Sequence, residues 1–228
     1  MIDGGMRHMR QEGLVNSDIF ATPVCVVGAG GIGSFTTLAL AKIGFQDISV
    51  WDMDMIEEHN ISNQFYPLSN VGVSKVDGLA QMISMFEGIS IRGYKKRWNK
   101  EEKLQGVVVA AVDNMKTRLE LFQAVKKDKN VLCLIDGRMG GNQLEVYTVF
   151  MQNKTDIRPY TRTLLSDEQI PDVPCTQKAV MYNVLNIASW ITNQIRLVLS
   201  GKEYKRQLIM DLETMMLVIP EERVRRGR

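Results

Sequence analysis

Short apolar runs alternate with longer mixed stretches along the first 136 residues of the chain. Runs typical of buried strands occupy residues 23–27, 47–52, 89–94, 106–112 and 131–136. Helices are predicted between them at 32–44, 73–87 and 114–129, and Gly44 is expected to end the first of these helices. Such alternation predicts an α/β fold, a Rossmann-like, doubly wound and mostly parallel sheet with helices on both faces.

The pattern changes after residue 136. A glycine turn followed by alternating residues at 137–150 predicts an antiparallel or mixed strand. Residues 151–176 are polar and contain proline, so we expect a long loop, a kind of segment that is usually functional or disordered. A long helix is expected at 177–202, because its apolar residues recur every three or four positions and form one core face: Val180, Val184, Ile187, Ile191, Ile195 and Val198. A hairpin of antiparallel strands is predicted to close the sheet at 206–219.

The chain length of 228 residues suits one domain with short appendages. We expect an N-terminal arm at 1–20, a single domain at 21–219 that includes the loop 151–176, and a basic tail at 220–228. Neither an internal repeat nor a low-complexity linker divides the sequence.

Charge and cysteine content exclude several classes of function. The 28 Lys and Arg residues nearly balance the 26 Asp and Glu residues, so neither nucleic acid nor a membrane surface is an expected partner. The basic stretch 92–103 also contains glutamates, which is typical of a solvated face. Apolar stretches fall short of the ~20 residues that span a bilayer. Three widely spaced cysteines without a CxxC pair argue against structural zinc, and with no signal peptide they favour a reducing cytoplasm.

The segment that follows the first predicted strand reads VVGAGGIGS. Gly28, Gly30 and Gly33 match G-x-G-x-x-G, with Gly31 as an additional glycine. In this motif the first glycine permits a tight turn, the second admits a phosphate to the backbone, and the third packs helix against strand. The helix N-terminus then attracts an anion. Asp52, 24 positions after Gly28, is placed to bind ribose hydroxyls. The loop therefore predicts a nucleotide site, for which NAD would be the default ligand.

Three charged residues beyond the loop favour a triphosphate over NAD. Asp54 lies two positions after Asp52, so in an extended segment both carboxylates face the same side. Lys75 opens a predicted helix, where a cation opposes the macrodipole and calls for an anionic partner; the alternative is a solvated surface lysine. Asp113 ends a predicted parallel strand at the carboxyl edge, where such folds bind ligands, although it can equally cap the next helix.

Four motifs in order, GAGGIGS, DMDMIEEHNISNQ, VGVSK and VDNMKTR, resemble those of the ThiF/MoeB and ubiquitin-activating-enzyme adenylyltransferases, from about residue 10 to 217. The resemblance implies ATP with Mg²⁺ and adenylation of a carboxylate, with release of pyrophosphate. The substrate implied is the C-terminus of a ubiquitin-like or sulfur-carrier protein, or of a peptide, and the enzyme would be a homodimer.

The resemblance also assigns roles by motif position. Asp52 would hold the ribose and Lys75 would contact phosphate, while Asp113 would bind Mg²⁺. Asp54 and Asn60 would line the polyphosphate and the reaction region. Arg10 would reach the γ-phosphate, often across a dimer interface.

Two departures from the family pattern leave alternatives open. Asn63 stands where the family has an arginine, and a neutral amide cannot replace that cation at a phosphate. Either Arg138, which follows a strand at the carboxyl edge, compensates, or activity is weakened and the protein is a nucleotide-binding scaffold. Cys175, just before a predicted helix, is either a thioester- or persulfide-forming thiol or a packing residue. A third alternative is an NAD(P)-dependent oxidoreductase, which would leave Asp54, Lys75 and Asp113 unexplained.

Overall fold

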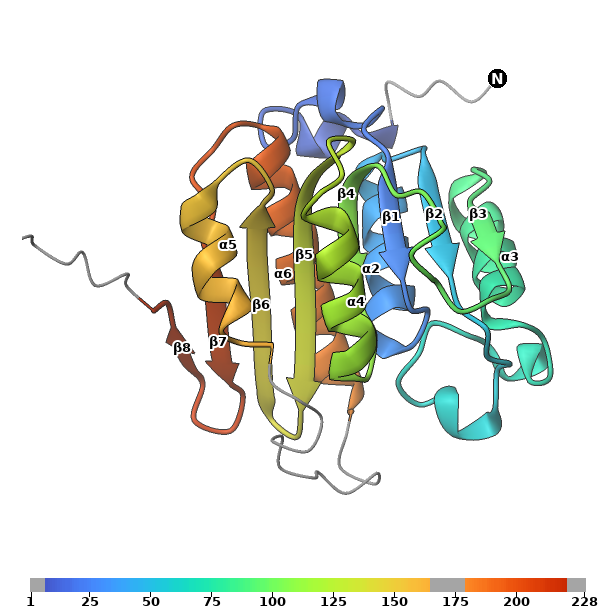
Figure 1. Cartoon of the computed structure of the whole chain (residues 1–228). Coiled ribbons are helices and arrows are strands. Elements are labelled where there is room, and N and C mark those ends of the chain that lie inside the picture. Colours follow the sequence, from blue (N-terminus) through green and yellow to red (C-terminus); the bar gives the residue numbers. More distant parts are fainter. Residues whose placement is uncertain (1–6, 165–178, 221–228) are drawn as a thin grey trace, which may run out of the picture.

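The computed structural model describes residues 7–164 and 179–220. Within them an eight-stranded sheet has the order β3-β2-β1-β4-β5-β6-β7-β8 (Figure 1). The strands are β1 (Val24–Val27), β2 (Ile48–Trp51), β3 (Arg92–Tyr94), β4 (Gly106–Ala110), β5 (Val131–Gly140), β6 (Gln143–Phe150), β7 (Gln207–Asp211) and β8 (Met216–Val218). Strands β1 to β5 pair in parallel and β5 to β8 pair antiparallel, which confirms the predicted fold class.

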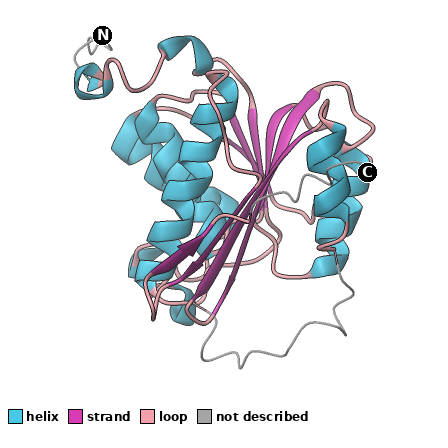
Figure 2. Ribbon diagram, turned by 90° about the vertical axis from the view of Figure 1, so that its left-hand side faces the viewer, coloured by secondary structure: helices cyan, strands magenta, loops and turns pink. Residues whose placement is uncertain are grey.

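Helices cover both faces of the sheet (Figure 2). One face carries α2 (Gly31–Ile43), α3 (Lys75–Glu87) and α6 (Met181–Leu199), and the other carries α4 (Met115–Val125) and α5 (Lys154–Thr161). Short 3₁₀ turns complete the loops: η1 (Met9–Gln11), η2 (Ser17–Ile19), η3 (Glu58–Asn60) and η4 (Leu68–Asn70). Gly44 ends α2 with a φ of 127°, a conformation that favours glycine, as the sequence predicts.

Alternating side chains of the central strands build two separate cores. In β1, Val24 and Val26 pack under α2, α3 and α6, whereas Cys25 and Val27 pack under α4 and α5. Both strand faces are therefore apolar, which explains the continuous apolar run in the sequence. Truncating a fully buried core residue such as Leu121 to alanine should cost about 2–5 kcal/mol of the free energy of unfolding.

The expectation of a continuous loop at 151–176 is wrong in its first half. Helix α5 occupies Lys154–Thr161 and packs on β6. Its N-cap is Asn153, whose side chain accepts a hydrogen bond from the Thr155 N–H, and the buried Asp156 accepts one from Arg206 Nε at 2.6 Å. The helix is short and contains Pro159, so its sequence shows little helical periodicity. Its N-cap and the contact between Asp156 and Arg206 stabilise it instead.

Residues 7–20, the described part of the N-terminal arm, lie at the amino edge of the sheet, at the top of Figure 1. Gln11 donates a hydrogen bond to the carbonyl of Ile43 at the C-terminal end of α2, and Arg7 donates to that of Glu87 at the end of α3. Both helices run back toward the amino edge, so the arm is held opposite the rim where the sequence places the nucleotide. Among the described residues, none of the helices is both apolar enough and long enough to cross a bilayer.

Candidate functional site

The predicted glycine loop joins β1 to α2 at the carboxyl edge of the sheet. Gly28 has a φ of 100°, and a Cβ there would lie 2.4 Å from the Ala111 carbonyl oxygen. A Cβ on Gly33 would lie only 1.8 Å from the Gly28 carbonyl oxygen. At these two positions a side chain would clash with the protein's own backbone, as expected for the first and third glycines of the motif.

Gly30 differs from its neighbours because a Cβ there would meet no atom within 4 Å. It is also the N-cap of α2, so this residue has no side chain with which to cap the first turn of the helix. The first-turn N–H groups of a helix lack intrahelical partners and carry partial positive charge. Gly30, the second glycine of the motif, thus leaves the N-terminus of α2 open to an anion. Gly31 differs, because a Cβ there would clash with the Val184 side chain.

Asp52, at the carboxyl end of β2, braces this loop. One carboxylate oxygen accepts a hydrogen bond from the Ala29 N–H at 2.7 Å, and the other accepts one from the Asp54 N–H at 2.8 Å. The hydroxyl of the buried Tyr66 donates to the Ala29 carbonyl at 2.6 Å, which fixes the loop from the other side.

Lys75 is the first residue of α3, as predicted, and it is not a solvated surface lysine. Its side chain is 9% exposed, and Nζ donates to Asp54 Oδ2 at 2.8 Å. The Asp54 side chain is 53% exposed, so the pair presents a carboxylate to solvent and a shielded cation beside it. The Lys75 N–H also donates to the Asp54 carbonyl at 3.0 Å, which ties the start of α3 to the loop after β2.

Asn60 and Asn63 have local partners in the loop between β2 and α3. The Asn60 side chain is buried and accepts a hydrogen bond from the Glu57 N–H, which completes a capping box around η3. Asn63 Nδ2 donates to the Ala179 carbonyl at 3.3 Å, just before α6. Asn63 therefore joins this loop to the segment that precedes α6.

Asp113 follows β4 at the same rim and is exposed. The alternative that Asp113 caps α4 is wrong, because the N-cap is Asn114, whose side chain accepts from the Thr117 N–H at 2.8 Å. Asn114 also donates to Asp113 Oδ1 at 3.0 Å. Across 7–164 and 179–220, no three acidic, histidine or cysteine side chains cluster as metal ligands. A single rim carboxylate nevertheless fits Mg²⁺, which proteins commonly bind through one or two carboxylates together with substrate phosphates.

The prediction that Arg138 follows a strand is wrong, because β5 extends to Gly140 and Arg138 lies within it. Arg138 takes part in a network of polar and aromatic side chains. Its Nε donates to Asp136 Oδ2 at 2.8 Å, and its terminal nitrogens donate to the carbonyl and hydroxyl of Thr163, both at 3.0 Å. The guanidinium stacks on Tyr147 at 4.3 Å from the ring centroid and lies 5.7 Å from that of Tyr160. Arg138 is thus held by several partners rather than projecting as a turn residue.

Asp136, Arg118 and Tyr160 complete this network. Asp136 is fully buried and accepts hydrogen bonds from Arg118 Nε at 2.6 Å and from the Tyr160 hydroxyl at 3.0 Å. Burial, together with the Asp136 carboxylate, raises the pKa of Tyr160 well above its ordinary value, so the hydroxyl remains a donor at neutral pH. An acidic residue that ends an apolar strand, like Asp113, is the sequence signal by which Asp136 could have been found.

The remaining predicted residues do not join the rim within one chain. Arg10 is an exposed residue of η1 in the arm at the opposite edge of the sheet. Cys175 lies outside the described residues. Cys25 and Cys133 are buried free thiols, as expected, and burial raises the pKa of Cys133 to about 12.

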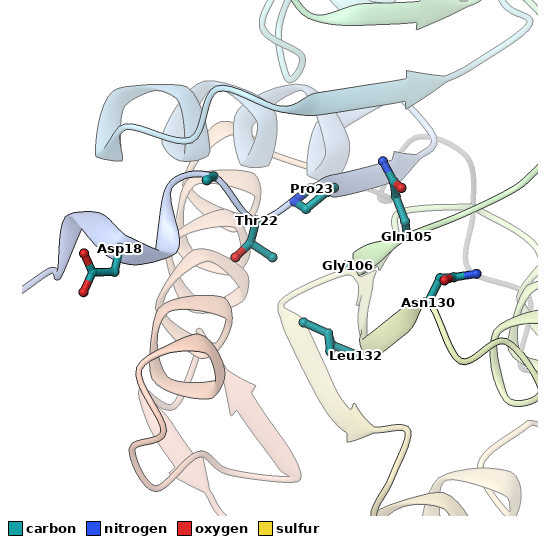
Figure 3. A pocket seen from close by; sticks show the side chains of 8 residues that line it. Asp18, Thr22, Pro23, Gln105, Gly106, Asn130 and Leu132 are labelled. Atoms are coloured by element: carbon teal, nitrogen blue, oxygen red, sulfur yellow. The ribbon is translucent and has the colours of Figure 1, made fainter.

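Two cavities lie away from the glycine loop. A shallow one of about 410 Å³ is lined by residues that precede β1, β4 and β5, including Pro23, Gln105 and Asn130 (Figure 3). It therefore belongs to the amino edge and not to the rim where parallel strands bind ligands. The larger one, about 800 Å³, lies beside α5 and includes Tyr147 and Tyr160, the rings against Arg138.

Similar solved structures share this architecture. PaaA superposes with a TM-score of 0.76 and 16% identity, covering 97% of this chain and 74% of that one. *Escherichia coli* MccB, with AMPCPP and MccA, has a TM-score of 0.74 at 12% identity over the same shares. The *E. coli* tRNA N6-threonylcarbamoyladenosine dehydratase TcdA has a TM-score of 0.67 at 18% identity, covering 86% of this chain and 95% of that one. At these identities the likeness shows the fold.

Sequence relatives include the tRNA threonylcarbamoyladenosine dehydratase of *Haemophilus influenzae*, 29% identical over 51% of this chain and 48% of that protein. The catalytic subunit of the NEDD8-activating enzyme E1 of *Schizosaccharomyces pombe* is 30% identical over 54% of this chain and 30% of that protein. The matched region thus spans less than half the length of these relatives. The family model of ThiF matches residues 6–221, and the chain belongs to the ThiF family.

Proposed function

We propose that the protein adenylates a carboxylate with ATP and releases pyrophosphate. One observation carries the proposal: a continuous chain of hydrogen bonds from Ala29 through Asp52 and Asp54 to Lys75, beside the open helix end at Gly30. It sets a shielded lysine, the partly exposed Asp52 and the exposed Asp54 beside a helix N-terminus that can bind an anion. That set of charges suits a triphosphate accompanied by a divalent cation.

The chemistry needs orientation and charge neutralisation more than acid–base catalysis. A carboxylate oxygen of the substrate attacks the α-phosphorus of ATP, a new P–O bond forms, and the bond to the β-phosphate breaks to release pyrophosphate. The carboxylate is already ionised at neutral pH, so no general base is needed. Lys75 would neutralise charge on the phosphates and Asp52 would hold the ribose. Asp113 would hold Mg²⁺, which when bound neutralises phosphate charge.

Arg138 is our candidate for the cation that Asn63 does not supply. Its stacking on Tyr147 and its hydrogen bonds to Asp136 and Thr163 hold its charge in place. A preorganised cation stabilises developing phosphate charge without reorganisation at the moment of reaction. Asn60, buried in its capping box, would then shape the loop that borders the reaction region.

The substrate we propose is the C-terminal carboxylate of a ubiquitin-like or sulfur-carrier protein, or of a peptide. Relatives that activate NEDD8 and the MccB structure with MccA support a protein or peptide substrate. The cavity beside α5 adjoins Arg138 through Tyr147 and Tyr160, so the partner would approach along it. We further propose a cytoplasmic homodimer.

Pyrophosphate exchange with Mg-ATP, measured across candidate carrier proteins, tests this function. The wild type should support exchange with one class of carrier. Asp113→Ala should abolish it, whereas Glu120→Ala, which removes an exposed carboxylate from α4, should leave it intact. Exchange that persists in Asp113→Ala would remove the assignment of the metal ligand.

Two other outcomes favour the alternative functions. ATP binding without exchange for every carrier would support a nucleotide-binding scaffold, as the loss of the arginine at position 63 suggests. Tight NAD(P)H binding without pyrophosphate release would support an oxidoreductase.

A further inference from the structure

The carboxylate of Asp136 joins two arginines that come from different elements. Arg118 on α4 donates to Oδ1 at 2.6 Å and Arg138 on β5 donates to Oδ2 at 2.8 Å. The Asp136 side chain is 0% exposed, and those of Arg118 and Arg138 are 6% and 18% exposed. This three-residue ion cluster is therefore shielded from water on the carboxylate side, where electrostatic interactions are strong.

Arg118 connects the cluster to the loop that carries Asp113. One terminal nitrogen donates to the Val112 carbonyl at 2.7 Å and also lies 3.3 Å from the Gly137 carbonyl oxygen. Val112 directly precedes Asp113, so the guanidinium fixes the backbone from which the candidate metal ligand projects. The guanidinium is planar and rigid, so the hydrogen bond between Nε and Asp136 also fixes the direction in which the terminal nitrogens of Arg118 point.

Arg138, the candidate cation of the rim, is held by the other oxygen of the same carboxylate. With Nε held by Asp136, its terminal nitrogens reach Thr163 and its plane lies over Tyr147. A single oxygen of Asp136 thus sets the orientation of Arg138, while the other sets that of Arg118.

A fully buried carboxylate is a costly way to gain stability, because desolvation offsets much of the ionic attraction. Its value here is geometric, since it holds two cations and, through Arg118, one backbone carbonyl in fixed relation at the rim. Groups that hydrogen-bond a metal ligand commonly control metal affinity, and here Arg118 acts one step further out, on the Val112 carbonyl beside Asp113.

We propose that Asp136 is a positioning residue for nucleotide and Mg²⁺ binding, acting through Arg118 on the Asp113 loop and through Arg138 on the phosphates. This inference rests on the proposed function. It goes beyond that function by naming a residue that would touch neither ATP nor Mg²⁺. Asp136 would act through two hydrogen bonds, its own with Arg118 and that of Arg118 with the Val112 carbonyl.

The test is the Mg²⁺ concentration that gives half-maximal binding of a fluorescent ATP analogue to the full chain. Asp136→Asn keeps the shape of the side chain but removes its charge, and we expect the half-saturating Mg²⁺ concentration to rise about tenfold or more. Glu87→Gln is the matched control, because Glu87 is another buried carboxylate that pairs with two cations, Lys42 and Arg7, but at the amino edge. It should leave the Mg²⁺ dependence unchanged even if the melting temperature falls.

Arg118→Lys carries the same test if Asp136→Asn does not fold. It retains a positive charge beside Asp136 but loses the fork that reaches Val112, so it should also raise the half-saturating Mg²⁺ concentration. An unchanged Mg²⁺ dependence in a folded variant of either kind would overturn the positioning role. Failure of the wild type to bind the analogue at any Mg²⁺ concentration would instead overturn the proposed function.

Discussion

Lys75 and Asp54 form an ion pair of 2.8 Å in which the lysine is almost completely buried and the aspartate is half exposed. The asymmetry matters because the lysine has been drawn out of water at the start of a helix, where the macrodipole disfavours a cation. Asp54 is joined through Asp52 to Ala29, so this ion pair is connected to the glycine loop whose helix end is open at Gly30.

Replacing Lys75 should affect the exchange activity much more than the stability of the protein. In Lys75→Met the side-chain volume is nearly kept and Asp54 remains solvated, so the melting temperature should change little. Loss of the cation should lower the pyrophosphate-exchange rate about 100-fold, as removal of one preorganised charge donor does in other active sites. Differential scanning fluorimetry and exchange assays measure the two quantities.

Lys42→Met is the matched control for that substitution. Lys42 also pairs with a carboxylate at 2.7 Å, but its partner is Glu87 at the amino edge of the sheet. Exchange should stay at the wild-type rate in this variant, and an equal loss in both variants would contradict a specific role for Lys75.

Two alanine substitutions in the glycine loop should have opposite consequences. Gly33→Ala places a Cβ 1.8 Å from a backbone oxygen, so the chain should lose about 4 kcal/mol or more of its free energy of unfolding, or fail to fold. Gly30→Ala meets no atom within 4 Å at a φ of −76°, so it should fold normally.

The Gly30→Ala variant then reports on the ligand. A methyl group at the open end of α2 should lower ATP affinity at least tenfold by blocking the approach of phosphate to the backbone. Isothermal titration calorimetry with ATP measures this affinity. Wild-type affinity in Gly30→Ala would show that no phosphate approaches this residue.

Thiol reactivity should distinguish the three cysteines. Burial raises the pKa of Cys133 to about 12, and it also raises the pKa of Cys25 above the ordinary value of a thiol. Raising the pH from 7 to 9 converts much of an ordinary cysteine to thiolate but leaves Cys133 almost wholly protonated. Iodoacetamide on the native protein should therefore leave Cys25 and Cys133 unmodified over this range.

Peptide mass spectrometry checks that prediction, with labelling in guanidinium as the control in which all three cysteines react. Modification of Cys133 in protein whose circular dichroism is still native would refute the assignment of a shielded thiol. Labelling of Cys175 under native conditions would favour a reactive thiol over the alternative of a packing residue.

The parallel half of the sheet could be predicted from sequence because its strands are buried on both faces. The runs that contain Val24 and Val107 are apolar at every position, and each begins next to a proline or glycine, so both could be predicted as buried strands. Helix α5 could not be predicted in this way, because its stability comes from Asp156 binding Arg206 from a distant part of the chain.

The residues of the candidate site differ in the same way in how far they could be predicted from the sequence. Gly28, Asp52 and Asp113 lie in local motifs at strand ends, which the topology brings to one edge of the sheet, and Lys75 lies in a local motif at the start of α3. Asp136 belongs to no motif, since its partners Arg118 and Tyr160 are separated from it by 18 and 24 positions. The place of Asp136 at the end of an apolar run and that of Arg118 in VDNMKTR are visible in the sequence, but their pairing across 18 positions leaves no signal of its own.

Arg10 gives the sharpest test of assembly. Within one chain it lies at the amino edge of the sheet, so it can reach a nucleotide at the carboxyl rim only from a second copy. We therefore expect Arg10→Ala and Lys75→Met to lose exchange activity separately and to recover part of it when they are mixed. In a mixed dimer, one site combines the intact Lys75 of one chain with the intact Arg10 of the other.

Random pairing in an equal mixture makes half of the dimers mixed, with one complete site each, so activity should recover to about a quarter of the wild-type value. The mixture should be refolded or co-expressed so that subunits exchange, and size-exclusion chromatography with light scattering should confirm the dimer. As a control, Lys75→Met mixed with Asp113→Ala should not recover, because both changes fall on the same rim and no mixed site is complete. Recovery in that control, or none in the Arg10 mixture despite confirmed mixed dimers, would contradict a role for Arg10 across the interface.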